Sequence, residues 1–429
     1  MTNSSTPFLL KGKKTSDAVF STKPHVLDGD KEAVMRVIDN GCLSDFFGST
    51  GDKFLGGEEV INFETKWSTT LDYKYAISTN SWSTGLISCL KACRISYGDE
   101  VICTPLTMSA TTSSILEVGA IPIFCDIEDK NYNINPELIE DCITHKTKAI
   151  MVVHLFGHPV DMPKITRIAK KHSLHVIEDA AHAPMAQIDN AYVGGLTSIG
   201  GFSMNYHKHI HCGEGGVIVT NNELLAKRAQ LIRNHGENAI ENCNLLSDEF
   251  IIGSNYRLTE IQAAIGSNQI NFLDQCIKHR NNLHYIMEEE LNEVKHILET
   301  PNIEKNCTHS FYCYALKFKE VPGKLNRKTF VNMVNGEFAT GSNWDQIPLS
   351  EGYTKPLYMN KIYKEPNIDN SLYPVLREYK NYYKYLKCEV AENAHFKSLI
   401  LSPIMHEGND ADQIRLLCQA IKKIINYYV

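Results

Sequence analysis

Residues 149–179 are AIMVVHLFGHPVDMPKITRIAKKHSLHVIED. Short apolar runs lie at each end, at 149–153 and 175–178, and Met162–His172 between them carries a helical pattern. A strand, a helix and a second strand in this order form a βαβ unit, whose two strands lie parallel in one sheet. The stretch therefore predicts an α/β fold.

The same alternation extends over much of the chain. Further short runs, mostly rich in Val and Ile and bounded by Gly, Pro or polar residues, predict strands at 75–79, 100–104, 121–125, 199–203 and 216–220. Between most of them lie about 10–15 residues of helical pattern. We expect a mostly parallel sheet covered by helices on both faces, which binds its ligand beyond the carboxyl ends of the strands.

The pattern divides the chain into three regions. Residues 1–35 are polar and mixed and predict an arm over the body of the molecule, and residues 36–274 carry the alternation and predict a large domain. Residues 275–429 are more polar and richer in Tyr, Asn and Lys, which predicts a second, smaller domain. Within it, 341–373 shows little periodicity and predicts a long loop, and long loops in compact domains are often functional.

Two amphipathic helices are predicted in the second half of the chain. One is expected at 257–274, with an apolar stripe of Leu258, Ile261, Ile265 and Phe272. The other is expected at 410–428, with Ile414, Leu417, Ile421 and Ile425 along one face.

Composition excludes several classes of protein. The 429 residues include 43 Lys and Arg against 50 Asp and Glu, a net charge of −7, which argues against a general nucleic-acid binder. The 13 cysteines are odd in number and form no C-x-x-C pair, so we expect neither a disulfide framework nor a metal site. The sequence shows no secretory signal and no apolar run of membrane-spanning length, and we expect a cytoplasmic protein.

The most informative stretch for chemistry is 201–216, GFSMNYHKHIHCGEGG. It places Lys208 after a predicted strand, in a turn rich in His and Gly, near the expected ligand edge of the sheet. A lysine in such a place can be partly desolvated, with a lowered pKa that suits Schiff-base chemistry. A surface lysine beside a flexible turn is the alternative.

A second stretch, 175–183, places Asp179 at the end of a predicted strand with no obvious cation beside it. A carboxylate there is costly unless it meets a cationic partner, and a protonated pyridinium nitrogen would be one. The alternative is an Asp that caps the next helix. His182, three residues on, could reach the same ligand, although a lone His is more often structural.

Two further turns carry weaker signals. Residues 79–86, TNSWSTGL, place small polar residues between a strand and a helix, where backbone N–H groups bind phosphate well. Helix capping explains that turn equally well. In 253–266, GSNYRLTEIQAAIG, Asn255 could reach a ligand, but its residue type favours a cap on the following helix.

In order and spacing these four stretches resemble the DegT/DnrJ/EryC1/StrS family of sugar aminotransferases, which use pyridoxal 5′-phosphate (PLP). The resemblance is strongest over about residues 35–275, with weaker matches at 388–392 (CEVAE) and 401–404 (LSPI). It implies the PLP-dependent fold type I, as in aspartate aminotransferase. That fold has a mostly parallel seven-stranded sheet and a smaller C-terminal α/β domain.

The resemblance also implies roles for individual residues. Lys208 would hold PLP as a Schiff base and later move the proton between substrate and cofactor. Asp179 would pair with the pyridinium nitrogen, and His182 would neighbour the phenolic oxygen. These three are the expected catalytic residues.

For the phosphate, the resemblance implies Ser203 and the backbone at Trp82 and Ser83. Asn255 matches the residue that reaches the phosphate from the partner subunit, which implies a homodimer with shared active sites.

Two positions depart from the family pattern. The common turn Ser-Gly-Thr is Ser81-Trp82-Ser83 here, so a bulky side chain is added near the cofactor. Where many members stack an aromatic on the pyridine ring, this chain has Met108, whose sulfur can pack there. Met108 could also belong to the core.

We therefore expect transamination from an amino acid, L-glutamate, to a keto-sugar, most simply a nucleotide-linked one. The product would serve surface polysaccharide, lipopolysaccharide or glycoside biosynthesis. Residues 1–35 and 341–373 are candidates for contacting the sugar, with His309, Tyr312 and Trp344 as possible contacts.

Two alternatives stay open. A branch of the family has His in place of the lysine and dehydrates sugars. Here His209 follows Lys208 directly, but the spacings to 202–203 and 213–216 match the lysine form. A catalytically idle member that acts as a regulator is the other alternative, since fold alone does not exclude it.

Overall fold

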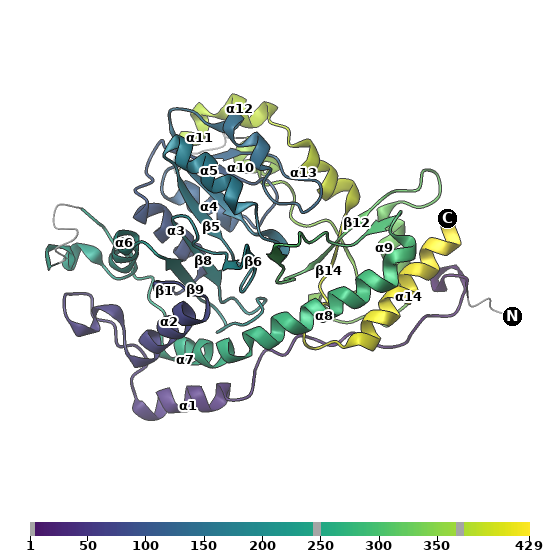
Figure 1. The fold of residues 1–429 in the computed structure, drawn as a ribbon, viewed down its shortest axis with the longest axis horizontal. Coiled ribbons are helices and arrows are strands. Elements are labelled where there is room, and N and C mark those ends of the chain that lie inside the picture. Colours follow the sequence, from purple (N-terminus) through teal and green to yellow (C-terminus); the bar gives the residue numbers. More distant parts are fainter. Residues whose placement is uncertain (1–4, 243–249, 366–372) are drawn as a thin grey trace.

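The computed structural model describes residues 5–242, 250–365 and 373–429. A seven-stranded sheet forms its centre, in the order β1-β9-β8-β5-β4-β2-β3 (Figure 1). The strands are β1 (Tyr75–Thr79), β2 (Glu100–Cys103), β3 (Ile121–Phe124), β4 (Thr147–Val153), β5 (His175–Asp179), β8 (Ile199–Ser203) and β9 (Gly216–Thr220). Each lies where the sequence predicted a strand.

The sheet is mixed but mostly parallel. β9 runs antiparallel to both of its neighbours, β1 and β8. The pairs β2–β3, β2–β4, β4–β5 and β5–β8 are parallel. The predicted fold class is confirmed.

Helices pack on this sheet and fix the position of the turns that connect them to the strands. The helices in contact with its strands are α2 (Glu58–Thr70), α3 (Trp82–Ala92), α4 (Ala110–Glu117), α5 (Met162–His172) and α6 (Glu223–Arg233), and α7 (Glu260–Gln269) packs on α2. α5 shows why the βαβ unit forms. Asp161 caps it by accepting the Lys164 N–H at 3.0 Å, a proline lies in its first turn, and Ser173 ends it in a left-handed conformation.

The helix predicted at 257–274 differs from the observed one. α7 begins at Glu260 because Thr259 is its N-cap, in a capping box with Gln262. A short 3-10 turn, Ile270–Phe272, then leads directly into α8 (Leu273–Leu291). The predicted boundary at residue 275 thus lies inside a helix that continues into the C-terminal part.

The C-terminal part has its own sheet and apolar core. Four strands pair in the order β10 (Leu298–Glu299), β12 (Tyr314–Phe318), β14 (Leu399–Ser402) and β13 (Ser350–Glu351), all antiparallel. α8 and α9 (Arg327–Gly336) each pack against α14 (Ala411–Tyr428) beside it (Figure 1). The four predicted apolar positions of α14 are all buried, and Asp410 caps the helix.

A smaller three-stranded sheet joins the two parts. It is formed by β6 (Gln187–Ile188), β7 (Ala191–Tyr192) and β11 (Cys307–Thr308), and β11 comes from the C-terminal part.

The predicted loop 341–373 contains 3-10 turns, the strand β13 and the short helix α10 (Lys361–Lys364), and its residues 366–372 lie outside the described residues. The short helices α11 (Val375–Glu378), α12 (Lys380–Tyr385) and α13 (Glu389–Asn393) follow it. The Tyr383 hydroxyl donates to the Pro122 carbonyl at 2.9 Å. This segment therefore packs on the β3 edge of the large sheet.

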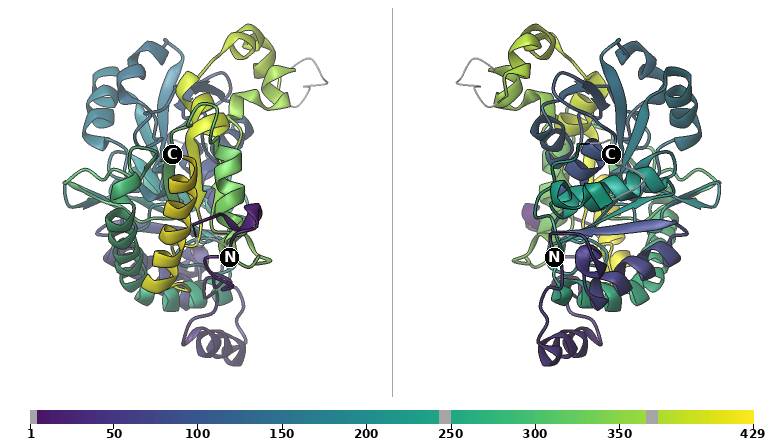
Figure 2. Two further views of the ribbon diagram at one scale, coloured as in Figure 1. Left: turned by 90° about the vertical axis from the view of Figure 1, so that its right-hand side faces the viewer. Right: turned by 90° about the vertical axis from the view of Figure 1, so that its left-hand side faces the viewer.

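The N-terminal region touches both parts. Phe20 belongs to the C-terminal core, and Ala33 and Val37 of α1 (Asp30–Asn40) pack on Ala264 of α7. Figures 1 and 2 show α1 at the edge of the molecule, beside α7. The predicted arm thus ends in a helix that begins at Asp30. Within the described ranges, no helix is long and apolar enough to cross a membrane.

Candidate active site

A cavity of about 320 Å³ lies at the carboxyl ends of the large sheet's strands. Val153, Asp179 and Ser203, the last residues of β4, β5 and β8, line it. The turns after β1 and β2 contribute Ser81 and Thr107. This is the edge at which open α/β sheets bind their ligands.

Seven of the eight predicted site residues line this single cavity. They are Trp82, Ser83, Met108, Asp179, His182, Ser203 and Lys208. They come from four separate turns of the large sheet, which the fold brings together.

Lys208 is half-buried and lines the cavity wall. Its backbone N–H donates to the Asn205 carbonyl at 2.9 Å, which holds the turn, and its Nζ lies 4.3 Å from the centre of the Tyr312 ring. Burial lowers the pKa of Lys208 to about 8, against the opposing attraction of Asp179. A lysine on the open surface is thus not what the structure shows, and more of this amine is neutral and nucleophilic near neutral pH than of an ordinary lysine.

Asp179 is held by three hydrogen bonds. Its Oδ1 accepts the indole N–H of Trp82 at 2.7 Å and the backbone N–H of Ala181 at 3.2 Å, and its Oδ2 accepts the Thr111 hydroxyl at 3.2 Å. A turn follows β5 rather than a helix, so the capping alternative is not observed. The carboxylate faces the cavity as an acceptor for a ligand donor.

His182 stacks on Tyr312, with ring centroids 4.0 Å apart and an interplanar angle of 9°. Burial, and then the neighbouring Lys208, lower its pKa well below the usual value, so the imidazole is neutral. Its Nδ1 is buried and has no hydrogen-bond partner in the described part of the chain. An unsatisfied polar atom beside a cavity fits a polar ligand there.

The start of α3 lies at the cavity, with backbone N–H groups that the helix itself leaves unpaired. Ser81 caps the helix, with its Oγ accepting the Thr84 N–H at 3.2 Å, and the next backbone N–H groups, of Trp82 and Ser83, have no partners within the helix. A Cβ on Gly216 would lie 2.8 Å from the Ser81 backbone, so only glycine lets β9 approach this turn. Ser203 adds a hydroxyl to the same cavity. These groups fit a phosphate.

Met108 is 55% exposed and lines the cavity, so the alternative that it belongs to the core is not observed. Asn255 is exposed and does not line the cavity. The expectation that Asn255 caps the following helix is also wrong, since Thr259 does so.

Three residues at or next to the cavity are not predicted by the sequence or are only possible contacts. Tyr353, which follows β13, lines the cavity, and Thr111, on α4, does not line it but donates its hydroxyl to Asp179 Oδ2. Tyr312 was a possible contact and lies at the cavity wall. The sequence around these residues shows no motif. The only feature that points to one of them is the spacing of Thr111 four residues after Thr107, which in a helix places both hydroxyls on one side.

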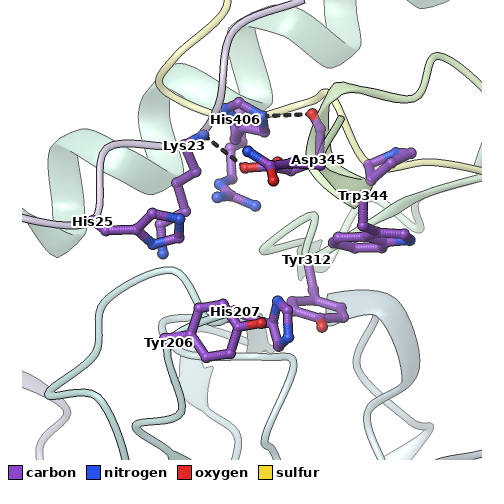
Figure 3. Close-up of a pocket in the computed structure, with 11 residues that line it drawn as sticks. Lys23, His25, Tyr206, His207, Tyr312, Trp344, Asp345 and His406 are labelled. Carbon is purple, nitrogen blue, oxygen red and sulfur yellow. Dashed lines mark hydrogen bonds between the residues drawn. The ribbon is translucent and has the colours of Figure 1, made fainter. Parts of the chain in front are cut away.

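A second cavity, of about 180 Å³, adjoins the first, and His207 and Tyr312 line both. Figure 3 shows Lys23 and His25 on one side of it and Trp344 on another. Trp344 was a suspected contact, whereas His309 is buried against Phe311 and lines neither cavity.

Lys23 brings the N-terminal arm to this second cavity. Its ammonium donates to the backbone carbonyl of Lys208. Its backbone N–H donates to Asp345 at 2.8 Å (Figure 3). Burial, and then the nearby Arg280, lower the pKa of Lys23 to about 8. The arm therefore packs against the backbone that carries Lys208. Nowhere in the described residues does a cluster of His, Cys, Asp and Glu suit a metal ion.

The sequence was compared with known proteins. The model of the DegT/DnrJ/EryC1/StrS aminotransferase family matches residues 49–415. GDP-perosamine synthase of Caulobacter vibrioides is 35% identical over 68% of this chain and 76% of its own length. The spore coat polysaccharide biosynthesis protein SpsC of Bacillus subtilis is 30% identical over 85% of this chain and 90% of its own.

The fold has close counterparts among solved structures. An aminotransferase from Psychrobacter cryohalolentis superposes with a TM-score of 0.79 at 27% identity, covering 95% of this chain and 99% of that one.

Proposed function

Because this chain belongs to the DegT/DnrJ/EryC1/StrS family of PLP-dependent sugar aminotransferases, we propose that it moves an amino group from L-glutamate to a nucleotide-linked keto-sugar, with PLP as its cofactor. The observation that carries the proposal is the single cavity in which a half-buried lysine with a lowered pKa, a fixed carboxylate and a helix N-terminus meet.

PLP supplies an electron sink for the carbanion formed at the carbon that gains or loses the amino group. The residues around the cavity fit it. Lys208 would attach the cofactor through its amine and then carry the proton, tasks that a lysine with a pKa of about 8 performs near neutral pH. Asp179 would accept a hydrogen bond from the ring nitrogen, and neutral His182 would lie beside the ring.

The phosphate end is assigned to the start of α3 and to Ser203. We propose that Asn255 of the partner subunit completes it. Its exposed position away from the chain's own cavity agrees with a role across a homodimer interface.

The relatives support the substrate class. One of the named relatives is a GDP-perosamine synthase and another a spore coat polysaccharide biosynthesis protein. We propose a product destined for a surface polysaccharide, including lipopolysaccharide.

The geometry does not favour the dehydratase alternative. His209 is buried with its Nε2 2.7 Å from the Ser310 carbonyl, and it does not line the cavity, whereas Lys208 does. A regulator without activity would have no use for a half-buried lysine beside a buried carboxylate.

The test is a two-step assay. Protein loaded with PLP is mixed with L-glutamate and a panel of GDP-, dTDP- and UDP-linked keto-sugars, and amino-sugar products are detected by mass spectrometry. We expect one nucleotide series to react and Lys208→Ala to be inactive. Borohydride treatment should attach the cofactor to Lys208. Absence of that adduct in PLP-loaded protein refutes the proposal.

A further inference from the structure

Trp82 occupies a position at which members of the DegT/DnrJ/EryC1/StrS family commonly have glycine. Its side chain is 5% exposed, and its indole N–H donates to Asp179 Oδ1 at 2.7 Å, the shortest of the three bonds to that carboxylate. The bulky residue is thus directed at the carboxylate rather than at solvent.

Two glycines make room for the indole. A Cβ on Gly85, one turn along α3, would lie 2.5 Å from the Trp82 ring. A Cβ on Gly201, which pairs with Asp179 across β5 and β8, would lie 2.8 Å from the ring. Real Cβ atoms do not approach so closely, so the indole fills a slot that these glycines leave open.

The hydrogen bonds divide the carboxylate into two unlike oxygens. Oδ1 accepts two N–H groups, from Trp82 and Ala181. Among the described residues Oδ2 has one hydrogen bond, from the Thr111 hydroxyl at 3.2 Å. With Oδ1 committed, Oδ2 keeps a lone pair for a further donor.

We propose that Trp82 is a positioning residue, whose indole N–H fixes the rotation of the Asp179 carboxylate so that Oδ2 is presented to the ring N–H of PLP. The inference rests on the proposed cofactor. A hydrogen bond to a charged acceptor is stronger than one between neutral groups, and a rigid ring buried in a slot holds its donor in place.

The contact is tested first without cofactor. The chain has three tryptophans, so ¹⁵N-labelled apoprotein gives three indole N–H signals, assigned with the Trp82→Phe, Trp67→Phe and Trp344→Phe variants. We expect Asp179→Asn to shift the Trp82 signal and leave that of Trp67, whose indole nitrogen is buried without a partner in the described structure. An unmoved Trp82 signal overturns the inference.

The second test measures PLP binding. Trp82→Phe keeps an aromatic ring and removes the donor, so we expect its Kd for PLP to rise about tenfold, the effect of losing one hydrogen bond to a charged group. The matched control is Trp67→Phe, which removes a buried indole N–H that lines no part of the cavity, and should leave the Kd unchanged. Thermal melts of both variants report on folding.

A spectroscopic readout separates positioning from packing. When the ring nitrogen is held less firmly in its protonated form, the ring withdraws less electron density from the Schiff base. The Schiff base then keeps its proton to higher pH, so in Trp82→Phe the pH midpoint of the visible band of bound PLP should move upward. If wild type and Trp82→Phe have the same Kd for PLP and the same pH midpoint, the positioning role of Trp82 is contradicted, while the proposed function is not. A wild type that binds no PLP contradicts the proposed function and the positioning role together, while the indole signals still report on the contact.

Discussion

At the scale of single residues, the cost of burying Lys208 predicts how apoprotein stability depends on pH. The pKa of this lysine falls from 10.5 to about 8 in the folded chain. Below pH 8 the folded state must hold a buried charge, which costs about 3 kcal/mol relative to the unfolded chain. The cost shrinks as pH rises from about 8 to 10.5, where the amine is neutral in both states.

We therefore expect apo Lys208→Met to be more stable than wild type at pH 7, with the difference fading toward pH 10.5. Urea unfolding at several pH values measures it. The exposed lysine Lys361 gives a control, since Lys361→Met should show no such pH-dependent gain. A stability difference that is the same at pH 7 and pH 10 would show that the Lys208 charge is not responsible.

Individual site residues and their contacts are the features that the sequence predicts least completely. Lys208, Asp179 and His182 were singled out because each directly follows a recognisable strand or turn motif. Tyr353 lines the same cavity and Thr111 donates to Asp179, but both come from segments whose own sequence shows only local packing. The bond from Trp82 to Asp179 joins residues 97 apart in sequence, and no local pattern encodes it.

At the scale of elements, α3 couples helix stability to the proposed phosphate site. Ser81→Ala removes the side-chain cap and should lower the free energy of unfolding by about 1 kcal/mol. Because the first turn also presents the Trp82 and Ser83 N–H groups, we expect weaker PLP binding as well. Chemical denaturation and PLP titration measure the two effects.

The control is another capped helix. Asn222 caps α6 by accepting the Leu225 N–H at 3.2 Å, and α6 does not line the cavity. Asn222→Ala should lose similar stability without weakening PLP binding. If Ser81→Ala binds PLP as tightly as Asn222→Ala does, the start of α3 does not hold the phosphate.

The elements differ in how far the sequence predicts them. All seven strands of the large sheet were predicted because each is a buried apolar run between turns. Two-residue strands such as β6 and β11 are too short to show an alternation of apolar and polar residues. They form because segments distant in the sequence pair with each other. α8 was missed because the sequence of 275–291 is polar on most of its surface, although its buried face includes Leu283 and Met287.

At the scale of the whole molecule, the arm and α8 connect the two apolar cores. Phe20 is buried in the C-terminal core, while Lys23, three residues on, bonds the backbone of Lys208 in the large domain. Movement of the C-terminal part would therefore displace the turn that carries Lys208. Asn255 lies outside its own chain's cavity, and under the proposed dimer the Asn255 of a second copy would complete the phosphate site.

A shared site makes a quantitative prediction for mixed dimers. Lys208→Ala removes the lysine, and Asn255→Asp places a like charge against the phosphate, so each homodimer should be inactive. In a mixed dimer one site carries both changes and the other carries neither, because the two residues come from different subunits. Random mixing of equal amounts makes half of the dimers mixed, each with one intact site, so activity should return to about a quarter of the wild-type value.

Subunits are exchanged by unfolding the mixture in urea and refolding it, and activity is compared with that of each variant refolded alone. The matched control pairs Lys208→Ala with Asp179→Ala. Both of these residues line the same chain's cavity, so every site of a mixed dimer keeps one defect and no activity should return. Recovery in the control, full activity of Asn255→Asp by itself, or an active wild type that sediments as a monomer would each contradict the shared site.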